Sequence, residues 1–139
     1  MDESDAAAQF IKLMQQTHTN FWFEKFGFII NPWYPYFGAS PDGFVGCDCC
    51  TTSIVEIKCP FCARFSGVKE QMGNKNFYLS AASGEIKLDE NHAYYYQVQM
   101  QLALSAQERC FFVVWSPTEA LGKYFTKKKQ YRSVGQWWK

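Results

Sequence analysis

Two short stretches decide the fold of this chain: Ser40-Pro41-Asp42-Gly43, and Ile54-Val55-Glu56-Ile57-Lys58-Cys59-Pro60. The segments 44–50 and 54–59 are rich in apolar and β-branched residues, and the polar residues 51–53 separate them. This pattern predicts two antiparallel strands joined by a turn at residues 51–53. Pro60 ends the second strand, because proline cannot donate a hydrogen bond to a strand ladder.

Alternation along the second strand places Glu56 and Lys58 on one face, and Val55 and Ile57 on the face toward the core. Asp42 lies in a turn just before the first strand, so we expect its carboxylate near that of Glu56. Two carboxylates beside a lysine suit metal-assisted phosphodiester hydrolysis, since Mg²⁺ prefers hard oxygen ligands. An isolated Glu-x-Lys is more often a surface ion pair. Here the Glu-x-Lys lies between Ser40-Pro41-Asp42-Gly43 and Cys59-Pro60, and this placement favours an active site.

The rest of the chain completes an α/β pattern. Helical periodicity predicts a first helix over residues 4–25, closed by Gly27, and a second over 91–106. A short strand over 28–31, a run of turns up to Gly43, loops with a short helix over 63–88, and a buried strand over 109–116 are also expected. The order helix, hairpin, helix, strand predicts one α/β domain over residues 1–139, built around a small sheet.

Three motifs together carry a family resemblance: residues 39–44 (ASPDGF), 55–60 (VEIKCP) and 93–99 (AYYYQVQ). In this order they are similar to the lambda-exonuclease family, also called the YqaJ viral recombinase domain, within the PD-(D/E)XK nucleases. The likeness runs from about Glu3 to Trp115. It implies a restriction-endonuclease-like fold, a mixed central sheet flanked by helices. It also implies a Mg²⁺- or Mn²⁺-dependent DNA nuclease, an exonuclease of recombination, repair or mobile-element processing.

The resemblance assigns roles residue by residue. Asp42, Glu56 and the carbonyl of Ile57 would bind the metal, and Lys58 would be the catalytic lysine. Gln97 would position the nucleophile or the phosphate.

Further candidates surround these residues. Glu3 fits the family's upstream active-site acid, and its alternative is a helix-start charge. Helical spacing puts Tyr94 and Gln101 on the face of Gln97. Ser40 lies in the first motif. His92 precedes the second helix, where it either faces the site or caps the helix.

Cysteines offer a competing interpretation. Cys47, Cys49, Cys50, Cys59 and Cys62 contain the Cys-x-x-Cys spacing of structural Zn²⁺ sites. With a turn at residues 51–53, however, Cys59 would lie beyond Cys47 along the sheet. Reduced thiols are therefore favoured over zinc, and His18 is expected to be an ordinary surface or boundary residue.

Composition sets the outer limits. The chain has 139 residues, 47% hydrophobic and 19% aromatic, which excludes disorder for most of it. The acidic start lacks the layout of a signal peptide, and no membrane span is expected, so an intracellular setting is predicted, in cytoplasm or nucleus. The basic and aromatic tail, residues 123–139, suits either a surface that binds single-stranded DNA or a solvated run of charges beside aromatic residues that cover the core.

The net charge is +1, and the sequence opens at the helix before which the resemblance implies a further, DNA-contacting segment. We therefore expect DNA binding by the chain to be weak and salt-sensitive, with a second copy or a partner protein supplying grip. The rival functions are a non-cleaving DNA-binding module of the same fold and a zinc-stabilised interaction domain. The presence of Asp42, Glu56, Lys58 and Gln97 together argues against a decayed site.

Overall fold

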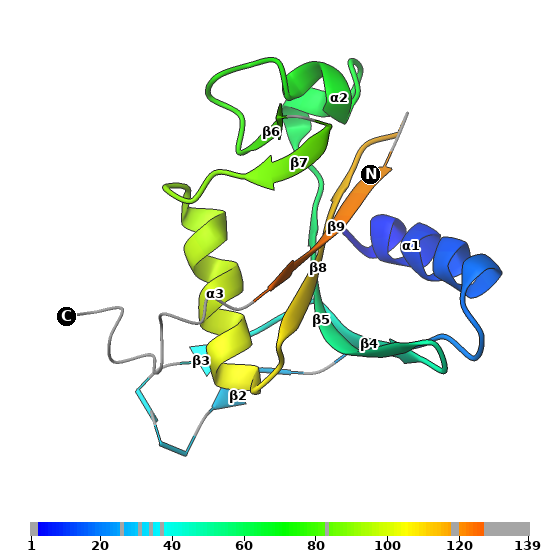
Figure 1. Cartoon of the computed structure of the whole chain (residues 1–139), viewed down its shortest axis with the longest axis vertical. Coiled ribbons are helices and arrows are strands. Elements are labelled where there is room, and N and C mark those ends of the chain that lie inside the picture. Colours follow the sequence, from blue (N-terminus) through cyan, green and yellow to red (C-terminus); the bar gives the residue numbers. More distant parts are fainter. Residues whose placement is uncertain are drawn as a thin grey trace.

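A mixed five-stranded sheet forms the centre of the molecule (Figure 1). The computed structural model describes residues 3–25, 27–30, 32–33, 35–36, 38–82, 84–117 and 120–126, with the backbone alone for residues 82 and 120–126. The strand order is β1-β4-β5-β8-β9, and only β5 and β8 run parallel. These strands are β1 (Trp22–Glu24), β4 (Gly43–Cys47), β5 (Cys50–Lys58), β8 (Arg109–Trp115) and β9 (Ala120–Thr126).

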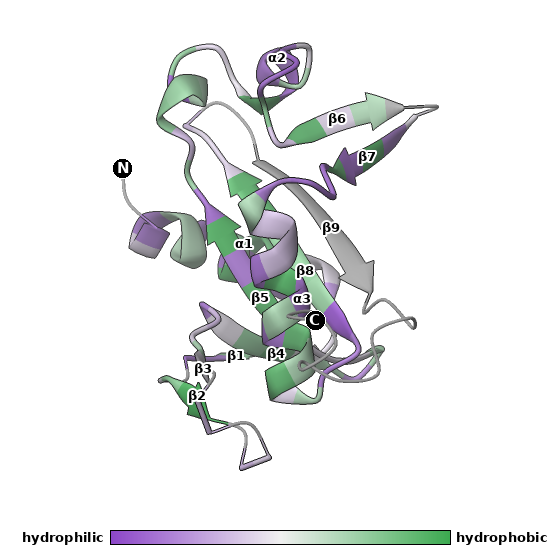
Figure 2. Ribbon diagram, turned by 90° about the vertical axis from the view of Figure 1, so that its left-hand side faces the viewer, coloured by the Kyte–Doolittle hydropathy of each residue, from purple (hydrophilic) through white to green (hydrophobic). Residues whose placement is uncertain are grey.

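One long helix covers each face of this sheet (Figure 1). Helix α1 (Glu3–Thr17) buries Phe10 and Met14 against Val55 and Ile57 of β5. On the opposite face, α3 (Ala93–Ser105) packs against Ile54 and alternate residues of β8. Because both faces are covered, β8 is apolar from Cys110 to Trp115, and β5 has buried apolar residues at Ile54, Val55 and Ile57, seen as green segments in Figure 2. Glu56 of β5 is a buried carboxylate on the α3 side.

Smaller elements flank this core. Strands β2 (Ile29–Ile30) and β3 (Gly38–Ala39) pair with each other, and Ala39 packs against Leu104 of α3. The other elements are η1 (Phe61–Ala63), α2 (Val68–Gln71), β6 (Leu79–Ala82) and β7 (Glu85–Leu88), the last two forming a hairpin. Within the described residues, no helix has both the length and the apolar character needed to cross a membrane.

The first helix is shorter than its periodicity predicts. It ends at Thr17, and residues 22–24 form strand β1 instead of continuing to Lys25. Asn20 takes the left-handed conformation, with φ of 53°, and reverses the chain. Aromatic residues favour the strand, and the ring of Phe23 lies so close to Gly43 that a Cβ there would be 2.5 Å from Phe23 Cζ. Tertiary pairing with β4 therefore overrides the helical pattern.

The predicted turn of the central hairpin is also wrong. The chain reverses at Asp48 and Cys49, with Cys47 opposite Cys50, whereas residues 51–53 belong to β5. Threonine is a good strand residue, and aspartate favours turns, so the polarity of the threonines was misleading. The register shifts between Val45 and Cys47, as in a β-bulge. Consequently the strand register that a turn at residues 51–53 would give does not form.

Other expectations are confirmed. The second helix spans residues 93–105 against the predicted 91–106, and strand β8 spans 109–115 against 109–116. The mixed sheet with a helix on each face is the restriction-endonuclease-like arrangement. In the basic and aromatic tail, residues 123–126 belong to β9, and residues 127–139 lie outside the described residues.

Candidate active site

The hairpin register carries Asp42 to the C-terminal half of β5. The backbone N–H of Asp42 donates to the carbonyl of Val55 at 3.0 Å, and Gly43 pairs with Val55. The Asp42 carboxylate then accepts a hydrogen bond from the backbone N–H of Ile57, with an Oδ2–N distance of 2.6 Å. Asp42 is thereby held beside the strand that carries Glu56 and Lys58.

Glu56 is held by three side chains. Its Oε1 accepts from Lys58 Nζ at 2.9 Å and from Gln97 Nε2 at 3.1 Å, while its Oε2 accepts from Gln101 Nε2 at 3.0 Å. The residue is only 4% exposed. A buried carboxylate with this many donors has a fixed orientation, as a metal ligand requires.

Lys58 is oriented by the same helix. Its Nζ also donates to Gln97 Oε1 at 3.1 Å, and it lies 4.2 Å from the centroid of the Tyr94 ring, a cation–π contact. Tyr94, Gln97 and Gln101 are spaced by three and four residues, so they share one face of α3. The expected helical phase, with Gln97 toward Glu56 and its two neighbours flanking it, agrees with these contacts.

The electrostatics of Glu56 reflect its surroundings. Burial raises the pKa of this carboxyl above its usual value, and the nearby charge of Asp42 raises it further. The hydrogen bonds from Gln101 and Lys58 and the charge of Lys58 lower the pKa but do not compensate. The Glu56 carboxyl therefore holds a proton more readily than a carboxyl group in water does.

A cavity of about 310 Å³ opens between α1 and the sheet on the side of Asp42. It brings Glu3, from the start of α1, and Lys25, from just after β1, to the same cavity as Asp42. Its lining residues are Glu3, Ser4, Ala7, Ala8, Ile11, Phe23, Lys25, Asp42 and Ile57. Sequence reasoning did not single out Lys25, because its position depends on the pairing of β1 with β4, which no local pattern signals.

Two of the expected neighbours have other positions. His92 is the N-cap of α3, where its Nδ1 accepts from the backbone N–H of Tyr94 at 3.0 Å. Of the two alternatives for His92, the structure therefore shows the helix cap. The His92 ring also packs against Tyr94, the residue whose ring contacts Lys58, with ring centroids 4.6 Å apart. Ser40 is exposed in the segment between β3 and Asp42.

Comparisons with known proteins agree with this arrangement. A crystal structure of an alkaline exonuclease, LHK-Exo from Laribacter hongkongensis, superposes with a TM-score of 0.63 at 24% sequence identity. The match covers 92% of this chain and 56% of that one. LHK-Exo in complex with dAMP matches equally well, with 55% of its chain covered. The chain thus spans just over half the length of these proteins, and the likeness shows a shared fold.

No curated protein matches the sequence significantly. A family model does match, that of the YqaJ-like viral recombinase domain, over residues 2–108. This range covers most of the chain and includes α1, the β4–β5 hairpin and α3, the elements that hold Glu3, Asp42, Glu56, Lys58 and Gln97. The chain therefore belongs to the YqaJ-like viral recombinase domain family.

Proposed function

We propose that this chain is a divalent-metal-dependent DNA nuclease that hydrolyses phosphodiester bonds, with Asp42, Glu56 and Lys58 at its centre. The observation that carries the proposal is the group of contacts around Glu56: a buried carboxylate beside Asp42, bound by Lys58 and by two glutamines of α3. A surface ion pair needs no such surroundings, and burying these groups is costly without a function.

The donor set fits a hard cation. Asp42 and Glu56 supply carboxylate oxygens, the ligands that Mg²⁺ and Mn²⁺ prefer, and the carbonyl of Ile57 would be a third oxygen. The raised pKa of Glu56 supports this fit, because a cation would offset the repulsion from Asp42 and the cost of burial. When bound, such a cation polarises a scissile phosphate and lowers the pKa of a water.

Lys58 then serves the reacting groups. Its ammonium has three N–H donors, of which Glu56 and Gln97 take two. The third donor is left for a phosphate oxygen or for the attacking water, whose developing negative charge the ammonium stabilises. In-line attack by that water would leave a 5′-phosphate and a 3′-hydroxyl.

Gln97 and Gln101 position these two groups. The amide of Gln97 accepts from Lys58 and donates to Glu56, so it sets the lysine and the carboxylate relative to each other. Gln101 fixes the other oxygen of Glu56. Glu3 lines the same cavity as Asp42 and would approach the metal site from α1, in keeping with a role as an active-site acid.

The family and the fold support a proposal for the substrate and the setting. LHK-Exo is described as an alkaline exonuclease, which supports an end-directed reaction here. We assign the activity to DNA recombination, repair or mobile-element processing inside the cell. A second copy of the chain or a partner protein would add DNA-binding surface, as the net charge of +1 suggests.

The test is a nuclease assay on end-labelled linear and circular duplex DNA, with Mg²⁺ and again with EDTA. Linear DNA should be degraded only with Mg²⁺, and circular DNA should persist. Asp42→Asn, nearly unchanged in shape, should abolish cleavage. If the folded protein binds DNA but cleaves none with Mg²⁺ or Mn²⁺, the chain is the non-cleaving module instead. Cleavage of the circle would contradict the end-directed part alone.

A further inference from the structure

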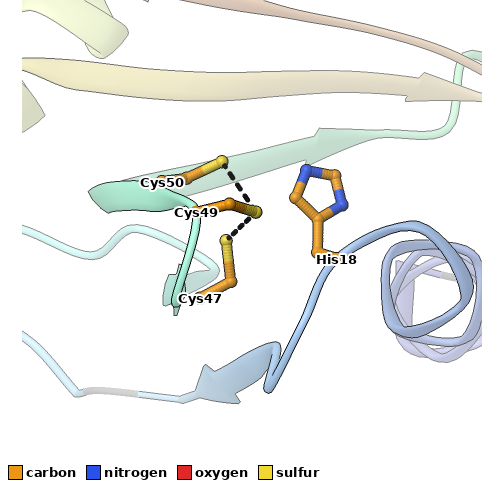
Figure 3. Close-up of side chains that lie close together, drawn as sticks. All are labelled: His18, Cys47, Cys49 and Cys50. Atoms are coloured by element: carbon orange, nitrogen blue, oxygen red, sulfur yellow. Dashed lines mark hydrogen bonds between the residues drawn. The ribbon is translucent and has the colours of Figure 1, made fainter.

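Three cysteines and a histidine converge at the end of the β4–β5 hairpin that is remote from Asp42 (Figure 3). They are His18, Cys47, Cys49 and Cys50. One ligand atom from each lies within 4.8 Å of all the others. This group shares no residue with the proposed nuclease site. Cys50 is six positions before Glu56 on β5, or roughly 20 Å along an extended strand.

The chain builds this cluster from two loops that are tied together. Cys47 ends β4, Cys50 opens β5 opposite it, and Cys49 occupies the turn between them. His18 directly follows α1, in the loop before β1. The two loops are joined by hydrogen bonds from Asp48 N to Thr19 O, at 3.0 Å, and from Asn20 Nδ2 to Asp48 Oδ2, at 2.6 Å.

The sulfur positions suit a tetrahedral ion. Cys49 Sγ lies 3.2 Å from Cys47 Sγ and 3.8 Å from Cys50 Sγ. Two thiolates on one tetrahedral Zn²⁺, with Zn–S bonds of about 2.3 Å, would be about 3.8 Å apart. Cys47 and Cys50 also have the Cys-x-x-Cys spacing of structural zinc sites. Three thiolates and one imidazole are soft to borderline ligands, which favours Zn²⁺ over Mg²⁺.

His18 is prepared to act as the fourth ligand. Its Nδ1 lies 2.9 Å from the hydroxyl of Thr17, and that hydroxyl donates to the carbonyls of Leu13 and Met14. When the Thr17 hydroxyl donates to one of these carbonyls, its oxygen can accept from Nδ1–H of the imidazole. The lone pair of the neutral ring is then on Nε2, the nitrogen available to a metal. An oxygen partner on the opposite ring nitrogen is a usual companion of metal-binding histidines.

We propose that His18, Cys47, Cys49 and Cys50 bind one Zn²⁺ as a structural site that fastens the end of α1 to the central hairpin. The sequence-based preference for free thiols depended on a turn at residues 51–53, which the register of β4 and β5 overturns. The bound Zn²⁺ would fix α1 at its C-terminal end, while the N-terminal end of α1 lines the cavity beside Asp42. The proposed zinc site is compatible with the proposed nuclease function and does not depend on it.

The experiment measures metal directly and uses no DNA. The full chain is purified without chelators, and the zinc content per chain is determined by mass spectrometry. The bound Zn²⁺ is then replaced by Co²⁺. We expect about one zinc per chain. We also expect a cobalt spectrum with the strong visible bands of tetrahedral coordination and thiolate charge transfer. Chelation should lower the melting temperature, and added Zn²⁺, but not Mg²⁺, should restore it.

Variants locate the site. Cys47→Ser and His18→Ala should each lose most of the zinc or change the cobalt spectrum. Cys62→Ser, which alters an exposed cysteine outside the cluster, and Asp42→Asn should retain both. If a variant does not fold, the cobalt spectrum of the unaltered chain decides. Zinc-free wild-type protein with free thiols or a disulfide would overturn the proposal, as would full zinc content in both Cys47→Ser and His18→Ala.

Discussion

At the scale of single residues, Lys58 connects the strand that carries the carboxylate with the helix that covers it. It contacts Glu56 on its own strand, and it contacts Gln97 and Tyr94 on α3. Lys58→Ala should lower the cleavage rate by about 100- to 1,000-fold, the usual loss when a donor to developing charge is removed. Metal affinity should change little, because Asp42 and Glu56 remain.

Steady-state cleavage and calorimetric titration with Mn²⁺ check this pair of outcomes. Lys12→Ala, which removes an exposed lysine of α1, is the matched control and should behave as the unaltered chain. A Lys58→Ala variant that cleaves at the normal rate would reduce this lysine to a structural role.

Gln101 offers a separate test, because its amide binds Oε2 of Glu56, whereas Lys58 and Gln97 bind Oε1. It donates to Glu56 Oε2 and is 2% exposed. This hydrogen bond lowers the pKa of Glu56, so Gln101→Leu should raise that pKa further. The ionised carboxylate is the form that binds metal, so the acidic limb of the pH–rate profile should move to higher pH. Metal affinity should fall by about 10- to 100-fold.

The profile and the affinity are both measured against Gln9→Leu, an exposed glutamine of α1. An acidic limb that stays in place in Gln101→Leu would show that this hydrogen bond does not control Glu56.

The sequence correctly grouped those residues of the proposed site whose positions depend on local periodicity. Strand alternation put Glu56 and Lys58 on one face, and helical spacing put Tyr94, Gln97 and Gln101 together. Lys25 was missed, and the convergence of His18 with the cysteines was not predicted, because both depend on where the segment after α1 crosses the hairpin. That crossing is set by contacts with residues more than twenty positions away, and sequence periodicity does not record them.

At the scale of elements, α1 is held by a narrow apolar stripe and carries Glu3 at its start. Phe10 is 5% exposed, and its ring stacks on Phe111 with centroids 5.2 Å apart. Phe10→Ala should lower the free energy of unfolding by about 3–5 kcal/mol. Leu13→Ala, on the same helix but 55% exposed, should cost less than about 1 kcal/mol. Urea unfolding of both variants measures the difference, and equal losses would mean that α1 does not pack on β5 and β8 as described.

The elements themselves were predicted best where a single tendency acted. Helix α3 and strand β8 have buried, uninterrupted patterns, and their limits were close. The turn of the β4–β5 hairpin was predicted several residues too late in the sequence, because Thr51 and Thr52 are polar yet favour strands. Arg109 reinforces their place in β5, since its Nη2 donates to Thr51 Oγ1 at 2.7 Å. Such an interaction between distant segments has no signature in the hairpin itself.

Element η1 and the turn that follows it present an exposed aromatic group close in sequence to Lys58. Phe61 and Phe65 are 75% and 83% exposed, and the guanidinium of Arg64 lies 4.0 and 4.4 Å from their ring centroids. Phe61 and Arg64 line a second cavity, of about 320 Å³, that begins at Cys59, directly after Lys58. Exposed rings with a cation suit base stacking and a phosphate contact.

The double variant Phe61→Ala/Phe65→Ala should therefore bind a single-stranded oligonucleotide about tenfold more weakly than the unaltered chain does. Its cleavage rate at saturating DNA should be unchanged. Tyr96→Ala, which removes an exposed ring from α3, is the control. Fluorescence anisotropy measures the affinities, and an equal loss in both variants would remove η1 from the DNA path.

At the scale of the whole molecule, charge limits what the chain can do alone. The net charge is +1, and the proposed site itself is acidic until a cation binds. Without metal, Asp42 and Glu56 repel a phosphate. With metal, the same place attracts it. Affinity for DNA should therefore depend on Mg²⁺ more strongly than a general salt effect explains.

The measurement uses Lys58→Ala, which should bind metal while cleaving far more slowly, and a short duplex at two salt concentrations, with Mg²⁺ and with EDTA. At physiological salt we expect a Kd in the micromolar range or weaker, as for non-specific binding through few phosphate contacts, and we expect it to rise with salt. Mg²⁺ should tighten binding in Lys58→Ala but not in Lys58→Ala/Asp42→Asn, because the second variant lacks a metal-binding carboxylate. Nanomolar binding that hardly changes with salt would mean that this chain already holds a complete DNA-binding surface. Equal Mg²⁺ effects in both variants would mean that the cation acts on the DNA rather than at Asp42 and Glu56.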